Sequence, residues 1–175
     1  MMPSRAVVLE DGAAVYLRPV RAEDKGRLAA LTDGLSPESR FRRYLGPKGH
    51  LTAAELAYFT EMDHRDHEAL VALDGPAGEA VGVARYIRHR SDPRSAEAAV
   101  VVADSWQRRG VGTALLRRLA AQAQAYGVRH FTGIVLTTNT APLRLLARLG
   151  PCDVTREPGG TTTVAVELAP PMAAG

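Results

Sequence analysis

The stretch Gln-Arg-Arg-Gly-Val-Gly at residues 107–112 says most about the fold and the site of this chain. It follows an apolar run, residues 98–103, that is typical of a buried strand, and it precedes residues 113–126, which have the spacing of an amphipathic helix. A strand that turns directly into a helix leaves the first helical N–H groups unpaired, and the helix dipole favours negative charge there. The stretch therefore predicts an anion site, with a phosphate or pyrophosphate as the expected ligand.

Glycines and arginines have separate parts in this expectation. Gly110 and Gly112 lack a Cβ, so the backbone can approach a bulky anion, and Arg108 and Arg109 add positive charge at the rim. These four residues alone would fit equally well a tight turn with solvated arginines. The stretch is also neither a nucleotide P-loop, because no Lys-Ser/Thr pair follows, nor a dinucleotide fingerprint, because the third glycine is missing.

Composition narrows the class of protein. The chain has 175 residues, of which 46% are hydrophobic and 23% charged, so one globular domain is expected. A net charge of +3 and an aromatic content of 5% argue against a nucleic-acid partner. The single cysteine, Cys152, excludes an intramolecular disulfide and any multi-cysteine metal site. Because no apolar run approaches the ~18 residues of a membrane span, we expect a cytoplasmic protein with no membrane partner.

The order of predicted elements is α+β. Strands are expected at residues 14–20, 68–73, 80–87, 95–102, 130–137, 153–156 and 161–168. Helices are expected at residues 21–31, 36–45, 52–59, 113–126 and 141–149. Together they predict a mixed, mostly antiparallel central sheet flanked by helices, with one right-handed parallel strand–helix–strand crossover at residues 98–136. We expect residues 13–168 to form a single domain, with a flexible lead-in at 1–12 and a flexible tail at 169–175.

This order, with the glycine turn in its middle, resembles the GNAT acetyltransferase superfamily. The superfamily motif R/Q-x-x-G-x-G/A is matched by Gln107, Gly110 and Gly112, and the resemblance extends over residues 14–168. It implies the GNAT fold, acetyl-CoA as acyl donor, and a pyrophosphate held by the turn, which makes cofactor-binding candidates of Gln107, Arg108, Arg109, Gly110, Val111, Gly112 and Thr113. It also implies that Asn139 contacts the cofactor arm, whereas its position alone predicts a helix N-cap.

A narrower resemblance concerns the acceptor. Residues 35–41, 59–64 and 68–73 are similar to the acetyltransferase domain of bacterial protein-lysine acetyltransferases, which modify acyl-CoA synthetases and related proteins. The implied acceptor is a protein lysine, with a small-molecule amine as the alternative and a non-catalytic CoA-binding module as the non-enzyme alternative. One departure is Leu149-Gly150-Pro151, where the superfamily usually has an aromatic residue after the glycine.

Amide formation from a thioester requires a polarised carbonyl and a deprotonated amine. Backbone groups of Val100, Val101 and Val102 are expected to lie along the pantetheine arm and to polarise the carbonyl. Since a lysine ammonium has a pKa of ~10.4, a base is needed, and the candidate is Glu97, which also matches the catalytic glutamate of the domains resembled. We expect partial burial to raise its pKa; the alternative is an exposed glutamate that pairs with Arg85 or Arg94.

Other polar residues have weaker claims. His64 and His67, near Asp63 and Asp66, are expected in a loop that could contact the acceptor, and no metal is expected. Cys152 is interpreted as a half-buried free thiol. A basic face on the second helix either is solvated or borders the acceptor groove; it comprises Arg40, Arg42 and Arg43. No tyrosine acid is evident in the last helix, and the oligomeric state is expected to be a monomer or a homodimer.

Overall fold

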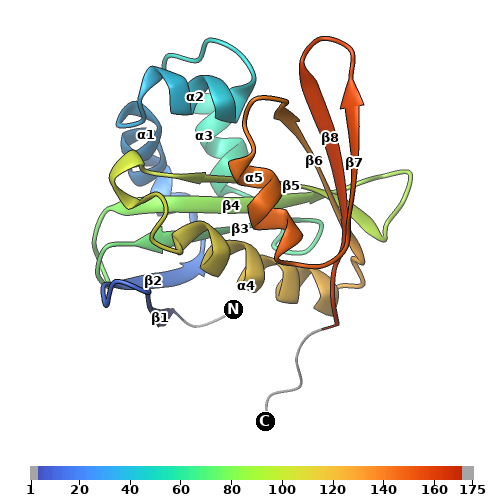
Figure 1. The fold of residues 1–175 in the computed structure, drawn as a ribbon. Coiled ribbons are helices and arrows are strands. Elements are labelled where there is room, and N and C mark those ends of the chain that lie inside the picture. Colours follow the sequence, from blue (N-terminus) through green and yellow to red (C-terminus); the bar gives the residue numbers. More distant parts are fainter. Residues whose placement is uncertain (1–3, 171–175) are drawn as a thin grey trace.

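The computed structural model describes residues 4–170, which form a twisted sheet of eight strands in the order β1-β2-β3-β4-β5-β6-β8-β7 (Figure 1). The strands are β1 (Arg5–Val8), β2 (Ala14–Pro19), β3 (His67–Leu73), β4 (Ala80–Arg88), β5 (Ser95–Val102), β6 (His130–Leu136), β7 (Cys152–Glu157) and β8 (Thr161–Glu167). The helices are η1 (Ala22–Asp24), α1 (Lys25–Asp33), α2 (Pro37–Tyr44), α3 (Ala53–Thr60), η2 (Asp104–Trp106), α4 (Val111–Ala125) and α5 (Ala141–Ala147).

Strand pairing is antiparallel everywhere except between β5 and β6. That pair is parallel and short, running from Ser95 opposite His130 to Glu97 opposite Thr132. Beyond Glu97, β5 stays paired with β4 as far as Val102, while β6 stays paired with β8 as far as Leu136. The sheet therefore divides into two halves that diverge from one point, as Figure 1 shows. The predicted α+β class and the single parallel crossover are confirmed.

Each face of the sheet has its own core because successive strand residues point to opposite sides. On one face the fully buried side of α4, with Leu115, Leu116 and Leu119, packs against Leu70 of β3 and Tyr86 of β4. On the other face Leu28 and Leu31 of α1 pack against residues such as Val71 and Val83. Helix α5 joins the α4 face through Leu146. Buried apolar side chains thus pack against both faces of the sheet.

Helix starts were predictable from local chemistry. The Ser36 side chain accepts a hydrogen bond from the Ser39 N–H at the start of α2, and Thr52 and Glu55 form a capping box at the start of α3. Helix α4 begins at Val111, two residues earlier than expected, because Gly110 takes the N-cap position.

Part of the expected flexible lead-in is a strand. Residues 5–8 form β1, which pairs antiparallel with β2 from Arg5 opposite Leu17 to Val8 opposite Ala14. A four-residue edge strand has little periodicity of its own and is ordered by the neighbour it pairs with. Of the expected tail, residues 171–175 lie outside the described residues, and Ala169 donates a backbone hydrogen bond to Leu149.

A buried ion pair positions α1 on the sheet. The Arg18 guanidinium on β2 donates to both carboxylate oxygens of Asp24, at 2.6 and 2.8 Å, and Asp24 also accepts the backbone N–H of Arg21. Arg18 is 8% exposed and Asp24 is 1% exposed. Burial acts to raise the pKa of Asp24, but the hydrogen bonds from Arg18 and Arg21 outweigh it and hold the pKa below 3.8.

Replacing Asp24 by Asn should therefore destabilise the fold. Asp24→Asn leaves the Arg18 charge buried without a counter-charge, which should lower the free energy of unfolding by about 3 kcal/mol in urea denaturation at pH 7. Because the pKa of Asp24 is lowered by folding, the contribution of the pair is present above the unfolded pKa and is lost as the pH falls below about 4. The difference between wild type and variant should thus shrink in acid; the exposed pair of Glu38 and Arg42, tested as Glu38→Gln, should show a far smaller effect.

Candidate functional site

The division of the sheet exposes the backbone of β5. The carbonyl oxygens of Ala96 and Ala98 face β6: Ala96 O lies 3.5 Å from the Thr132 hydroxyl, and Ala98 O lies 3.4 Å from where a Cβ on Gly133 would be. Peptide groups alternate in direction along a strand, so those of Val100 and Val102 point the same way. Past Glu97 there is no paired β6 residue to meet them. The N–H and C=O of Val100 therefore face the opening, where they can bind an extended ligand.

The opening ends at the glycine turn. Gly110 has φ +93° and is the N-cap of α4, and the N–H groups of Val111, Gly112 and Thr113 belong to the first turn, which has no intrahelical acceptors for them. Gly110 is required for its left-handed conformation. Gly112 has a further reason that the sequence did not show: a Cβ there would lie 3.1 Å from Leu145 Cδ1, so the glycine also allows α5 to pack closely on α4.

Side chains around the turn brace it. The Gln107 amide donates to the Val102 carbonyl at 3.1 Å and to the Ser39 hydroxyl at 3.4 Å. Arg109 forms an ion pair with Asp11 at 2.5 Å, and its guanidinium lies 4.0 Å from the centre of the Trp106 ring. Arg108, at φ +59°, is exposed and forms no ion pair within residues 4–170. Of the two arginines expected at the rim, Arg108 is the one available to a ligand.

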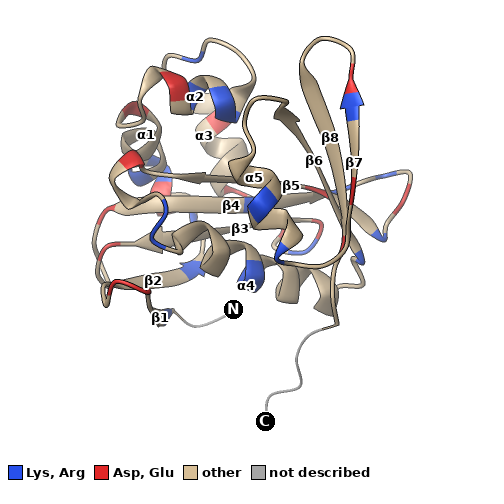
Figure 2. Cartoon of the chain, viewed as in Figure 1, with Lys and Arg blue, Asp and Glu red and all other residues tan. Residues whose placement is uncertain are grey.

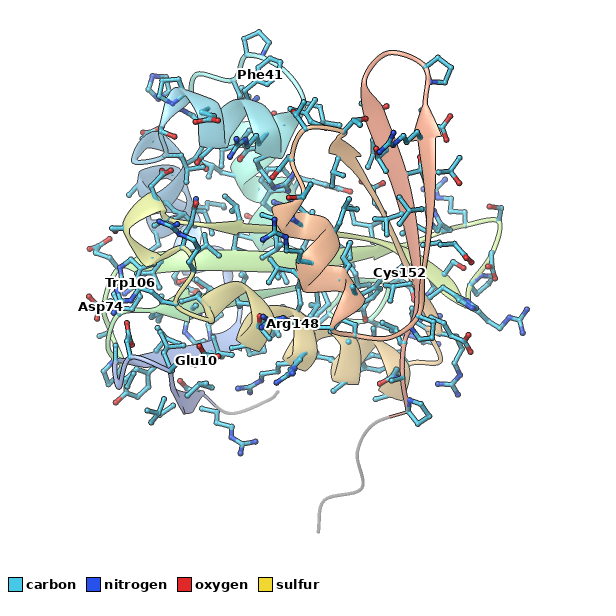
Figure 3. The ribbon with its side chains drawn as sticks, viewed as in Figure 1. Glu10, Phe41, Asp74, Trp106, Arg148 and Cys152 are labelled. Atoms are coloured by element: carbon cyan, nitrogen blue, oxygen red, sulfur yellow. The ribbon has the colours of Figure 1, made fainter. Side chains whose placement is uncertain are left out.

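Asn139 is buried but does not cap α5, so that prediction was wrong. The helix begins one residue later, with Thr140 as N-cap, and has no side-chain cap. Asn139 instead closes a turn through its N–H, which donates to the Leu136 carbonyl at 2.8 Å, and Pro142 occupies the first turn of α5. Asn139 thus follows β6, across the opening from the end of β5. At the far end of α5, Arg148 donates to the Thr113 hydroxyl at 3.3 Å and ties α5 to α4 (Figure 3).

Asp104 was missed by sequence reasoning. Its carboxylate accepts from the Ser36 N–H at 2.9 Å, the Ser36 hydroxyl at 3.2 Å and the Ser39 hydroxyl at 2.6 Å. Helix α2 is therefore fastened to the end of β5 by its N-terminus. No local pattern indicates a contact between residues 65–68 positions apart in the chain.

Glu97 lies where the halves of the sheet separate. Its strand partners are Ile87 on β4 and Thr132 on β6, and His67 lies beyond Ile87, so these side chains form one row across a face of the sheet. The side chain of Glu97 is exposed, so the expected partial burial was wrong: no element covers the sheet at this point. Within residues 4–170 Glu97 forms no ion pair, although its charge acts on Arg43 and Arg85.

A groove of about 560 Å³ adjoins this row through Ile87 and His67. Its other walls are Tyr58, Asp63, Arg65, Asp66, Arg88, His89, Arg90 and Pro93. His67 is the first residue of β3 rather than a loop residue. Burial, helped by the charge of Arg85, lowers the pKa of His67 below 6.5, so the imidazole is neutral at pH 7. Ile87, the strand partner of Glu97, therefore forms one wall of the groove.

The described residues offer little basis for a metal site, a reactive cysteine or a membrane-spanning helix. Residues 4–170 contain no group of three or more His, Cys, Asp or Glu side chains that could hold a metal ion. Burial raises the pKa of the Cys152 thiol, which disfavours its reactive thiolate form. None of the helices in the described part of the chain is both long and apolar enough to span a membrane.

The sequence of the chain is similar to that of known acetyltransferases. The family model described as "Acetyltransferase (GNAT) family" matches residues 30–150. The chain is 34% identical over 164 residues to the acetyltransferase Pat of Mycolicibacterium smegmatis, covering 94% of this chain and 49% of that protein. The chain thus spans about half the length of this relative.

Solved structures show the same arrangement. The GNAT domain of S. lividans PAT superposes with a TM-score of 0.86 at 30% identity, covering 96% of this chain and 100% of that domain. A GNAT superfamily phosphinothricin acetyltransferase from Sinorhizobium meliloti, solved in complex with AcCoA, superposes with a TM-score of 0.73 at 19% identity, covering 92% of each chain. The second likeness shows the fold alone.

The tether at Asp104 can be tested by hydrogen exchange. Asp104→Ala removes three hydrogen bonds to α2, so we expect the amides of α2 to exchange about three- to tenfold faster while those of α4 keep their rates. Asp92→Ala is the matched control, because Asp92 likewise accepts from a backbone N–H and a serine hydroxyl in an exposed loop. Equal protection of α2 in wild type and Asp104→Ala would contradict this role.

Proposed function

The chain belongs to the GNAT acetyltransferase family, and we propose that it moves the acetyl group of acetyl-CoA directly to an amine, with Glu97 as general base and a protein lysine as acceptor. The observation that supports this most is the opening between β5 and β6. It presents the peptide groups of Val100 at one end and the first-turn amides of α4 at the other. An extended donor with a thioester at one end and a pyrophosphate along its length matches this order of hydrogen-bond donors.

Binding and polarisation rest on main-chain groups. Acetyl-CoA, when bound, supplies the acetyl group as an activated thioester. The N–H groups of Val111, Gly112 and Thr113 and the guanidinium of Arg108 are positioned to bind the pyrophosphate. The Val100 N–H is positioned to donate to the thioester carbonyl. Val101 and Val102 belong to the strand that carries these groups. Gln107 holds the turn by donating to the Val102 carbonyl, and Arg109 holds it through the ion pair with Asp11. We propose that buried Asn139, across the opening, contacts the pantetheine arm.

Proton removal is assigned to Glu97. The acceptor ammonium, with a pKa of ~10.4, is mostly protonated at neutral pH and must lose a proton before it can attack. Glu97 is exposed, its strand partner Ile87 lines the groove, and it forms no ion pair within residues 4–170, so its carboxylate is free to accept that proton directly or through one water. No tyrosine of α5 can serve as the acid, since the helix has none. Proton delivery to the leaving thiolate is therefore assigned to water or to the acceptor's own proton.

The acceptor class rests on the relatives. The similarity to Pat proteins, together with a groove open to solvent beside Glu97, favours a lysine on a protein surface over a buried small-molecule pocket. A small amine is the alternative acceptor, and a CoA-binding module without activity is the non-enzyme alternative. The cytoplasmic location and a monomeric or homodimeric state stay predictions.

The Glu97→Gln variant should lose turnover but still bind acetyl-CoA. We expect kcat near pH 7 to fall by about 10²–10⁴-fold, because the amide cannot accept a proton, while calorimetric affinity for acetyl-CoA stays within a factor of two or so. The deficit should narrow as the pH approaches ~10, where the acceptor is increasingly deprotonated in solution. Glu157→Gln, an exposed glutamate on β7, is the control. Unchanged turnover in Glu97→Gln would remove Glu97 from the mechanism.

Gly110→Ala should weaken the donor site. At φ +93° an alanine costs about 1–2 kcal/mol, and relief of that strain would turn the first N–H groups of α4 away from the pyrophosphate. We expect calorimetric affinity for CoA to drop by at least about tenfold. Gly75→Ala is closely matched, because Gly75 has φ +96°, has open space around its Cβ position and lies in the β3–β4 turn. It should lose similar stability and bind CoA normally; equal CoA affinity in both variants would refute the assignment of the turn.

A further inference from the structure

Two arginines beside the proposed point of transfer form no ion pair within residues 4–170. Arg43, in the last turn of α2, and Arg85, on β4, line one narrow cavity between α1, α2, α3 and the sheet. Arg85 lies 3.5 Å from the centre of the Phe59 ring, and Arg43 lies 5.1 Å from that of Tyr44. Neither guanidinium makes a hydrogen bond or an ion pair with any residue between positions 4 and 170. Figure 2 shows the basic last turn of α2 above the sheet.

Arg18 shows how unusual this is. Arg18 and Arg85 are each 8% exposed, yet Arg18 has a two-point contact with Asp24, and Arg85 has only the face of an aromatic ring. A guanidinium taken out of water loses hydration that must be replaced by hydrogen bonds or by an opposite charge. Asp24 replaces it for Arg18, whereas no residue between positions 4 and 170 does so for Arg85, whose guanidinium nitrogens depend on the little solvent that reaches them.

The charges around the pair do not neutralise it. Burial, and then the neighbouring Arg43, lower the pKa of Arg85 to about 9, so the group is still charged at pH 7. Burial likewise lowers the pKa of Arg43. Glu97 is the carboxylate whose charge opposes both shifts, and it forms no ion pair with either within the described chain. One carboxylate against two guanidiniums leaves a net positive charge in the cavity.

We propose that Arg43 and Arg85 form a subsite for a carboxylate, borne by the acyl group of the donor or by the amine acceptor. The location follows from the register: Arg85 is the strand partner of Ala99, the residue before Val100, so the subsite adjoins the place assigned to the thioester. This inference rests on the proposed function for its substrates, but the subsite itself rests on the two unpaired charges.

The size of the cavity selects the ligand. Its free volume is about 10 Å³, roughly the room of one water molecule. Any anion must therefore widen the cavity, and a planar carboxylate requires less widening than a tetrahedral phosphate while still accepting hydrogen bonds from two guanidiniums. Helix α2 can yield a little, because none of its residues is fully buried and it ends at Leu45 in a left-handed conformation.

Thermal unfolding tests the subsite without any transfer chemistry. Sodium succinate should raise the Tm of the full chain more than succinamide at equal concentration, and Arg43→Met and Arg85→Met should abolish the difference. Because each variant removes an uncompensated charge, neither should unfold at a lower temperature than wild type in the absence of carboxylate. Arg42→Met is the control, since Arg42 is on the same helix but exposed and paired with Glu38; it should keep the succinate effect.

Two further arms identify the source of the carboxylate. If the donor bears it, succinyl-CoA should bind at least tenfold more tightly than acetyl-CoA by calorimetry. If the acceptor bears it, Nα-acetyl-lysine should have a KM at least tenfold lower than its amide, Nα-acetyl-lysinamide, with acetyl-CoA as donor. Either preference should vanish in Arg43→Met, which keeps the result interpretable should Arg85→Met fail to fold.

The outcomes separate this inference from the proposed function. A succinate effect that depends on Arg43, without binding of either thioester, supports the subsite and rejects the proposed function. Binding of acetyl-CoA with no carboxylate preference in any of the three arms rejects the subsite and leaves the proposed function standing. A carboxylate preference that persists in both methionine variants also rejects the subsite.

Discussion

The parting of β5 from β6 after Glu97 is the constraint on which the rest of the site depends. Three residue pairs hold the strands together, and then each strand follows its other neighbour. A sheet normally satisfies the peptide groups of a central strand on both sides. Here the cores under β4 and β8 hold the halves apart, so the peptide groups of Val100 have no strand partner on one side. Main-chain donors that are already fixed lose no entropy when a ligand binds them.

The point where the sheet divides brings together the proposed base, the groove and the arginine cavity. Glu97 stands at the last paired position, and its strand partner Ile87 lines the groove. Arg85 lies two residues from Ile87 on β4, and Arg43 reaches the same cavity as Arg85 from α2. The glycine turn lies at the other end of the opening, at the start of α4. A donor bound along β5 and an acceptor from the groove would therefore meet at Glu97 without any movement of the sheet. Figure 1 shows β6, β7 and β8 diverging from β5.

The two ends of helix α2 are held differently against the rest of the fold. Its N-terminus is fixed by Asp104, while its C-terminal turn carries Arg43 into the cavity and has no fully buried residue. The basic face expected on this helix is thus divided. Arg42 is exposed and paired with Glu38, as on an ordinary solvated helix, and Arg43 is turned toward the sheet. The spacing of the arginines in the sequence could not show which of the two is exposed, because that depends on which side of the helix packs against the sheet.

Local patterns in the sequence determined the α+β order, the helix caps at Ser36 and Thr52, the crossover and the glycine turn. Each depends on residues close together in the chain, whose dihedral preferences and periodicity act before any tertiary contact forms. Only the tertiary structure decided that Glu97 is exposed, that Asp104 holds α2, that residues 5–8 pair with β2, and that Arg85 forms no ion pair within residues 4–170. Those facts depend on which distant segments meet, and burial and pairing across the sheet are set by packing rather than by neighbours along the chain.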